Sequence, residues 1–113
     1  MLPKNRRVSR HIFQEVVKKG QWAESPRLSL RFFYDPKRQK SVFAVSVSAK
    51  VLKTAVKRNL FKRRVRYILR ELMPKVSPGI AGVFFLKKGA QNVSFEELKS
   101  DTLFLLQRSK ILK

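Results

Sequence analysis

The feature that most constrains this chain is a basic segment over residues 49–70, which holds nine Lys or Arg residues. No Asp or Glu occurs between Asp35 and Glu71. At about 100° per residue of an α-helix, apolar residues of the segment gather on one arc, and four of the basic residues gather with Asn59 on the opposed arc. The apolar arc contains Phe61, Val65, Ile68, Leu69 and Leu72, and the opposed arc contains Asn59, Lys62, Arg63, Arg66 and Arg70. The segment predicts a helix that presents one face to a core and the other to anions.

The spacing of the charges on the basic arc indicates an external partner. Lys62, Arg66 and Arg70 follow one another at i, i+4, an arrangement of like charges that costs about 0.2–0.5 kcal/mol per pair. A face that meets only water gains from pairs of opposite sign, and this one has none. Arg binds phosphate oxygens bidentately, and phosphate contacts position a nucleic acid without reading its sequence. The segment predicts affinity for a polyanion rather than base specificity.

The composition of the whole chain agrees with this interpretation. Its 113 residues include 27 Lys and Arg against 7 Asp and Glu, a net charge of +20. A hydrophobic content of 43% with nine Phe predicts one folded domain over residues 1–113 rather than a disordered basic tail. RNA, DNA and an anionic membrane are the polyanions that such a charge attracts. The chain has no cysteine, so disulfides and thiolate metal sites are excluded.

Hydrophobic periodicity predicts three helices and three strands, with room for a fourth strand. The predicted helices are 9–19 with Gly20 as its stop, 54–73 ended by Pro74, and one that begins at Ser94, whose spacing from Glu97 has the form of a capping box. The predicted strands are 27–34, 41–48 and 80–86. This order predicts an α/β (α+β) two-layer sandwich, in which a mixed sheet of about four strands packs with three helices. Residues 110–113 are expected to form a frayed end.

A membrane location is disfavoured by the sequence. No apolar run approaches the roughly 20 residues of a membrane span, and the N-terminal stretch lacks the apolar region of a signal peptide. A basic amphipathic helix can also lie on anionic lipid, but here its apolar arc is needed to cover the strands. We therefore expect a cytosolic protein. DNA is harder to exclude as a partner, although no helix-turn-helix or zinc-finger spacing is present.

Residues 55–71, AVKRNLFKRRVRYILRE, resemble the signature segment of the bacterial ribonuclease P protein subunit. That family's pattern is approximately Lys-x-x-x-Ala-Val-x-Arg-Asn-Arg-x-Lys-Arg, followed by apolar residues and Arg-Glu. The chain departs from it at Leu60, which replaces the second Arg of the trio, and near Lys53, where a glycine is usual. Matching positions are held by Arg58, Asn59, Lys62, Arg63, Arg70 and Glu71.

The resemblance extends over nearly the whole chain, and it carries implications for fold and function. It implies a sandwich with a left-handed βαβ crossover, against the usual right-handed preference. It also implies a subunit of a ribonucleoprotein endonuclease that removes the 5′ leader from precursor tRNA. The implied partners are the ribonuclease P RNA and precursor tRNA, with no obligate protein partner. Mg²⁺ and the phosphodiester chemistry are implied to belong mainly to the RNA subunit.

The resemblance further implies two binding surfaces. The signature helix and the basic residues before it would meet the RNA subunit, through Lys50, Lys53, Lys57, Arg58, Asn59, Lys62, Arg63, Arg66 and Arg70. A cleft between the first helix and the sheet would take the leader, with Phe13, Val17, Arg31, Phe33 and Phe43 as candidates. For Phe13, core packing is an equal alternative. Strand alternation does not say which face of the sheet the strand candidates occupy, and Val17 stands where the family often has an aromatic residue.

The two alternative classes of function are a nuclease and a structural RNA-binding protein. A nuclease that uses its own side chains needs a general base or a carboxylate metal cluster. His11 is the single histidine, and Glu96, Glu97 and Asp101 share one helix surface, where the helix dipole already explains acidic residues. No catalytic or metal-binding side chain is therefore predicted. A structural RNA-binding protein, such as a small ribosomal protein, or an RNA chaperone has the same composition and differs only in the signature segment and element order.

Overall fold

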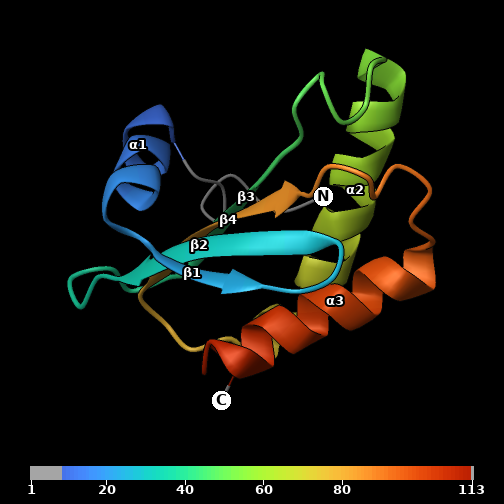
Figure 1. Ribbon diagram of the computed structural model, residues 1–113. Helices are drawn as coiled ribbons and strands as arrows, with labels where there is room; N and C mark the ends of the chain where they lie inside the picture. Colours follow the sequence, from blue (N-terminus) through green and yellow to red (C-terminus); the bar gives the residue numbers. More distant parts are fainter. Residues whose placement is uncertain (1–8, 113) are drawn as a thin grey trace.

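The structure is a computed structural model that describes residues 9–112. It contains four strands and three α-helices, with a short 3₁₀ helix after the longest helix (Figure 1). In chain order these are α1 (Arg10–Lys19), β1 (Gln21–Glu24), β2 (Leu28–Tyr34), β3 (Val42–Ser46), α2 (Ala55–Leu72), η2 (Met73–Lys75), β4 (Ile80–Leu86) and α3 (Phe95–Arg108). The three predicted helices and three predicted strands are confirmed, and β1 supplies the fourth strand.

The four strands form one mixed sheet in the order β1-β2-β4-β3. β1 pairs with β2 and β2 with β4 in antiparallel fashion, whereas β3 pairs with β4 in parallel. β4 is central, and both of its neighbours hydrogen-bond to it. A strand covered on both faces reads as a continuous apolar run, which is why 80–86 consists only of apolar residues and one glycine.

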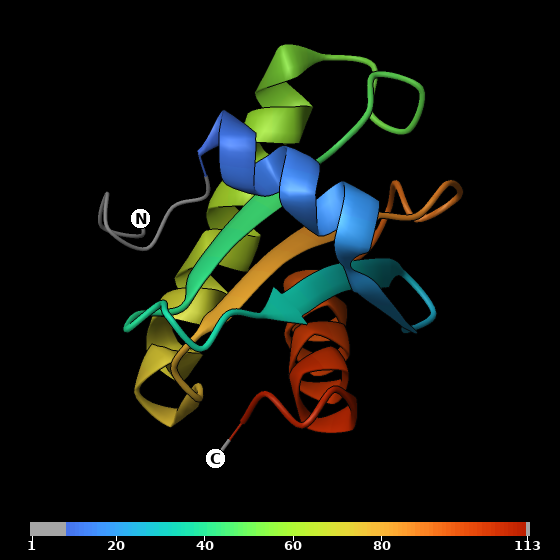
Figure 2. The same cartoon turned by 90° about the vertical axis from the view of Figure 1, so that its left-hand side faces the viewer.

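Helices cover both faces of the sheet. Figure 2 shows α1 in front of the sheet with α2 and α3 behind it. In the same view β3 and β4 run toward the upper right, with β4 on the lower right of β3. Seen from the side of α2, β4 therefore lies to the left of β3, so the β3–α2–β4 crossover is left-handed, as the resemblance implies. The sheet with α2 and α3 forms the expected sandwich, and α1 adds a single short helix to the opposite face.

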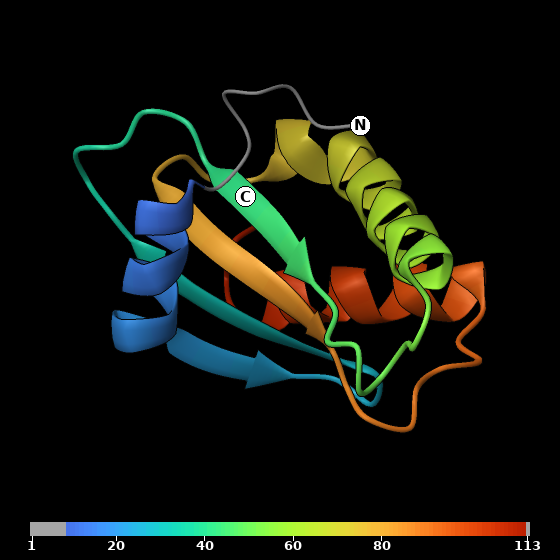
Figure 3. The ribbon, with the colours of Figure 1, turned by 90° about the horizontal axis from the view of Figure 1, so that it is seen from above.

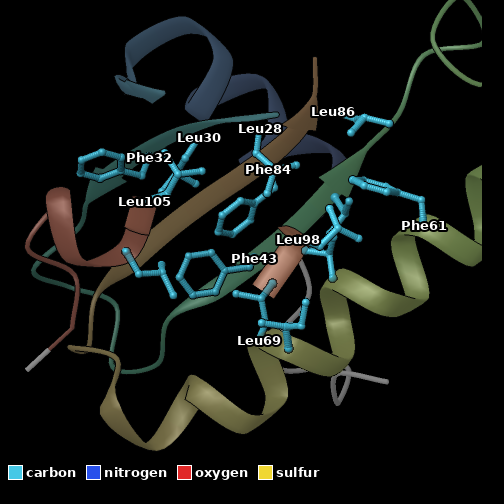
Figure 4. Close-up of a cluster of buried hydrophobic side chains, with 14 of the residues drawn as sticks. Leu28, Leu30, Phe32, Phe43, Phe61, Leu69, Phe84, Leu86, Leu98 and Leu105 are labelled. Carbon is cyan, nitrogen blue, oxygen red and sulfur yellow. The ribbon is translucent and has the colours of Figure 1, made fainter. Parts of the chain in front are cut away.

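The main core lies between the sheet and the α2–α3 layer (Figure 4). The Phe43 and Phe84 rings meet there with centroids 5.9 Å apart. The predicted apolar arc of α2 enters this core: Phe61, Val65, Ile68 and Leu69 are buried, and Leu72 packs against them half-buried. A smaller cluster, centred on Val16 of α1, lies on the other face.

The ends of the helices are fixed by side chains and by one close turn. The Thr54 hydroxyl accepts a hydrogen bond from the Lys57 backbone N–H (3.2 Å) at the start of α2, and Ser94 and Glu97 form the predicted capping box of α3. α1 ends at Gly20, where a Cβ atom would lie 2.4 Å from the Val16 carbonyl oxygen. Only glycine allows the chain to pass so directly from α1 into β1.

The prediction of a frayed end is wrong for residues 110–112. Ile111 is 1% exposed and belongs to the main core, and its carbonyl accepts a hydrogen bond from the Ser77 N–H (2.8 Å). Leu112 forms an antiparallel bridge with Val76. The end of the chain was expected to fray because it is short and follows a helix, but its apolar residues close the core beneath η2. Lys113 lies outside the described residues.

Candidate nucleic-acid interface

The basic face of α2, defined here as Asn59, Lys62, Arg63, Arg66 and Arg70, runs along the side of the helix that turns away from the core, whereas Lys57 lies one turn before the buried Phe61. Arg63 and Arg70 are exposed, and Lys62 is half-buried. Among residues 9–112, no ion pair joins any of these three cations to a carboxylate. Like charges a turn apart repel one another, so an anion from outside stabilises this face.

Arg58 has a different role from the other predicted cations. Its Nη1 atom donates to the carbonyl oxygens of Leu52 (2.7 Å) and Lys53 (3.1 Å), which lie in the loop before α2. The guanidinium thereby fastens this loop to the first turn of the helix. Lys50 and Lys53 are exposed in the loop and so extend the basic face beyond the helix. The nine residues predicted to contact an RNA subunit thus all lie on α2 or the loop before it, with Lys57 and Arg58 outside the basic face.

Tyr67 lies at the border between the basic face and α3, and no sequence pattern assigned it a role. Its ring is 52% exposed and packs against Phe95 of α3, with centroids 6.1 Å apart. A hydrogen bond with the Glu71 side chain raises the pKa of the Tyr67 hydroxyl. This contact occupies the single carboxylate that α2 carries.

A second surface forms where α1 crosses the sheet, and we call it the α1–sheet surface: Phe13, Val17, Trp22, Arg31, Phe33 and Phe85. Phe85 of β4 is its centre, since the Phe13 ring lies 6.3 Å and the Trp22 ring 6.4 Å from it. The Arg31 guanidinium stacks 3.8 Å from the centroid of the Trp22 ring and also donates a hydrogen bond to the Val17 carbonyl. Trp22 nevertheless remains 54% exposed, so a large aromatic face beside a cation is open to solvent.

Four of the five predicted leader-binding residues lie on this surface, and Phe43 does not. Alternation along β3 turns Val42 toward α1 and Phe43 toward the α2–α3 layer, where Phe43 is 1% exposed. Gly82 of β4 pairs with Phe43 and leaves room for its ring, because a Cβ atom there would lie 3.0 Å from it. The assignment of Phe43 to the leader surface is therefore wrong.

Trp22 and Phe85 are the members that sequence reasoning missed. Trp22 lies in a four-residue strand without an alternating pattern. Phe85 lies in an apolar run that looks wholly buried, although it shares its side of β4 with Ala81 and Val83. The one available signal was the period of two in that run, which places Phe85 on the face opposite Phe84.

Two of the three acidic residues of α3, Glu97 and Asp101, form ion pairs with Arg27. Its guanidinium lies 2.6 Å from the Glu97 carboxylate and 3.1 Å from that of Asp101, which is 4% exposed. Asp101 also accepts hydrogen bonds from the Ser25 hydroxyl (3.1 Å) and the Arg27 backbone N–H (2.9 Å). These carboxylates tie α3 to the β1–β2 turn, and they do not fit a Mg²⁺ site of the protein.

The other candidate for side-chain chemistry is equally unsuited. His11 is exposed on α1, with its Nε2 atom 3.2 Å from the Glu15 carboxylate. Within residues 9–112, no group of three or more His, Cys, Asp or Glu is placed to hold a metal ion. Nor does any helix of that range have the length and apolar content to cross a membrane.

A mixed four-stranded sheet, three helices and a cationic helix face define a small α+β protein whose charge suits a polyanionic partner. The sequence profile of the family described as Ribonuclease P matches residues 1–110. The chain is 34% identical to the ribonuclease P protein component of a Pseudanabaena species, over 99% of this chain and 97% of that one. It is 33% identical to the component of Enterococcus faecalis, over 88% and 84%. The chain belongs to the ribonuclease P protein family.

Solved structures show the same fold. The Staphylococcus aureus RNase P protein superposes with a TM-score of 0.86 at 18% identity, covering 96% of this chain and 98% of that one. The Thermotoga maritima RNase P protein gives 0.80 at 25% identity, covering 90% and 96%. As a member of this family, the protein is a component of a tRNA-processing ribonucleoprotein, and an RNA partner is implied.

Proposed function

We propose that this protein binds the catalytic RNA of ribonuclease P through the basic face of α2 and the 5′ leader of precursor tRNA through the α1–sheet surface. In this role it assists the Mg²⁺-dependent cleavage that leaves the mature 5′ end of the tRNA, in the bacterial cytosol. No obligate protein partner is part of the proposal. The observation that carries it is the row of Lys62, Arg63 and Arg70, on the helix that matches the family signature, which forms no ion pair with a carboxylate of residues 9–112.

The chemistry of the α1–sheet surface supports a single-stranded ligand. Unstacked bases bind to aromatic rings and Arg planes, whereas the deep groove of an RNA duplex does not admit such contacts. Trp22 with Arg31 stacked on it, flanked by Phe13 and Phe85, supplies a ring and a cation together. Each base stacked on such a platform contributes about 1–3 kcal/mol, largely independently of its identity.

The distribution of acids and bases supports assigning the chemistry to the RNA. Hydrolysis of a phosphodiester needs an activated water and stabilisation of developing charge. Glu97 and Asp101 are engaged by Arg27, and His11 faces solvent beside Glu15. We therefore assign to the protein the binding and positioning of RNA, and to the RNA subunit the Mg²⁺ that supports cleavage.

The experiment that tests the proposal is cleavage of 5′-labelled precursor tRNA by a bacterial ribonuclease P RNA at low Mg²⁺, with and without the protein. We expect strong stimulation of cleavage at the mature 5′ end. Salt-sensitive binding to many RNAs without stimulation would instead indicate a general RNA-binding role. Cleavage by the protein alone would contradict the assignment of the chemistry to RNA.

A further inference from the structure

A pocket of about 440 Å³ lies beside the first turns of α2, next to the loop lysines that extend the basic face. Its walls come from the loop before α2, from α2 itself and from the loop between β4 and α3. Figure 3 shows the two loops at the same end of the molecule, next to the start of α2. Pockets of about 300–1,000 Å³ are the usual size for a small organic ligand, so the volume suits one nucleotide.

The walls of the pocket combine an apolar floor with a basic rim. Leu52, Phe61 and Leu98 supply buried apolar surface at its base. The rim carries four cations and no carboxylate: Lys50, Lys53, Lys57 and Arg64. Opposite the helix, Gln91 and Asn92 are exposed, and their side-chain amides make no hydrogen bond within residues 9–112. The pocket thus offers a place for an aromatic base, donors and acceptors for its edge, and cations for its phosphate.

Leu60 is a pocket residue at which this chain departs from the family signature. It stands where the family signature has Arg, it is 43% exposed, and it lines the pocket. An Arg at this position would bring a fifth cation to the rim and fill part of the space with a long polar side chain. Leu instead leaves an apolar wall that faces solvent, which is stabilised when an apolar ligand covers it.

We infer that the pocket receives one unstacked nucleotide of the RNA subunit, with its base against Leu60 and Phe61 and its phosphate among the lysines of the rim. This inference rests on the proposed function, and it adds base insertion to the phosphate contacts of α2. Arg58 holds the pocket open, because its hydrogen bonds to the Leu52 and Lys53 carbonyls fix the loop that forms one wall.

The first test is a nuclear magnetic resonance titration of the free protein with AMP, GMP, CMP and UMP, each compared with inorganic phosphate at matched ionic strength. We expect saturable shifts of the Leu60, Asn92 and Val93 amides with the nucleotides but not with phosphate. Identical shifts with phosphate would overturn the inference, and so would shifts confined to Trp22 and Phe85 or no saturable shift at millimolar nucleotide.

The second test compares Leu60→Arg with Val56→Arg in binding to the RNA subunit. Val56 is 78% exposed one turn earlier and does not line the pocket, so the two variants add the same charge to the same helix. Relative to Val56→Arg, we expect Leu60→Arg to bind the RNA about tenfold more weakly and to lose the nucleotide shifts. Thermal melts check that both variants fold.

The outcomes separate this inference from the function on which it rests. If the unmodified protein stimulates cleavage and Leu60→Arg binds as well as Val56→Arg or better, the pocket assignment fails and the proposed function stands. If the unmodified protein neither binds the RNA subunit nor stimulates cleavage, the proposed function fails, whatever the titration gives.

Discussion

The basic face of α2 and the α1–sheet surface differ in how they are built. The first belongs to one helix and the loop before it, so a local period in the sequence is enough to form it. The second is assembled from α1, β1, β2 and β4, and its central ring, Phe85, is more than 60 residues from Trp22. A charged surface can therefore be formed by one local segment of the sequence, whereas an aromatic platform forms only when the complete sheet brings distant residues together.

The two surfaces also differ in the physics of binding. Cations that meet phosphates release counterions, so affinity through α2 falls steeply as salt rises. Stacking on Trp22 buries aromatic area and depends much less on salt. Four sets of variants test whether the two surfaces bind separate partners.

The largest effect is expected from the double variant Lys62→Ala and Arg63→Ala. Each lost charge-assisted hydrogen bond is worth about 1.5 kcal/mol, so affinity for the RNA subunit should fall about 100-fold. The slope of log affinity against log salt should decrease by about 1.5, and leader binding should be unchanged. Filter binding over a series of salt concentrations measures both quantities.

The matched control for that variant removes two exposed lysines from the loop between β2 and β3, by Lys37→Ala and Lys40→Ala. It has the same change in net charge but leaves α2 intact, so it should weaken RNA-subunit binding far less. Equal losses in the two double variants would show that net charge, and not the face of α2, governs binding.

Trp22→Ala should weaken leader recognition about tenfold, because one stacked base is lost. The quantity to measure is the ratio of holoenzyme affinities for precursor and mature tRNA, which isolates the leader. Affinity for the RNA subunit should stay constant. A change in RNA-subunit affinity with an unchanged ratio would mean that Trp22 contacts the RNA subunit and not the leader.

Two controls accompany Trp22→Ala. Phe104→Ala removes a partly exposed aromatic from α3, away from the α1–sheet surface, and Phe43→Leu alters a core ring on the opposite face of the sheet. Both should leave the ratio of precursor to mature tRNA affinity unchanged, although Phe43→Leu should lower the melting temperature. A lower ratio for Phe43→Leu at full folding would restore Phe43 to the leader surface.

Arg58→Lys keeps the positive charge but removes the guanidinium that holds the loop before α2. It therefore separates the effect of loop positioning from the effect of charge on α2. The unfolding free energy should fall by about 1 kcal/mol, and RNA-subunit affinity should fall several-fold. Arg63→Lys, which changes an exposed cation without a loop contact, should be tolerated better. Denaturant titration measures the unfolding free energy of both variants, and a binding assay measures their affinity for the RNA subunit. Equal losses in the two variants would mean that the two arginines do not differ in role.

The smallest effect concerns Glu97, which lies outside both surfaces. A hydrogen bond from the Ser94 backbone N–H lowers the pKa of Glu97 below its ordinary value near 4.5. The ionised Glu97 side chain therefore stabilises the folded state at pH values above the ordinary pKa. This contribution to the unfolding free energy is lost as the pH falls through the lowered pKa. Glu97→Gln should reduce stability at neutral pH slightly and flatten its decline at acidic pH.

Melting temperatures between pH 3 and pH 7 measure this dependence. RNA-subunit and leader affinities at neutral pH should be the same for Glu97→Gln and the unmodified protein. A loss at either surface would mean that the capping box of α3 supports binding from a distance, which would weaken the separation of surfaces from scaffold.

The parts of the molecule that were predictable from sequence are those with a local cause. The buried residues of α2 followed from their helical period, and the α3 capping box from the spacing of Ser94 and Glu97. Phe43 was misplaced because alternation defines two faces without saying which is covered by which helix. Trp22 was not assigned because β1 is an edge strand without periodicity, and the burial of Ile111 was missed because it depends on the core and on the Ser77 N–H, which lies far earlier in the chain.

The central position of β4 means that the sheet is incomplete until late in synthesis of the chain. This strand begins at Ile80, so the basic segment 49–70 leaves the ribosome before the strand that completes its sheet. At about 5–20 residues per second, the nascent polycation precedes β4 by roughly one to three seconds, surrounded by ribosomal RNA. A chain that terminates before Ile80 carries the charge of α2 without Phe85, Gln91 or Asn92. Such a fragment attracts RNA but lacks the aromatic platform and one wall of the pocket.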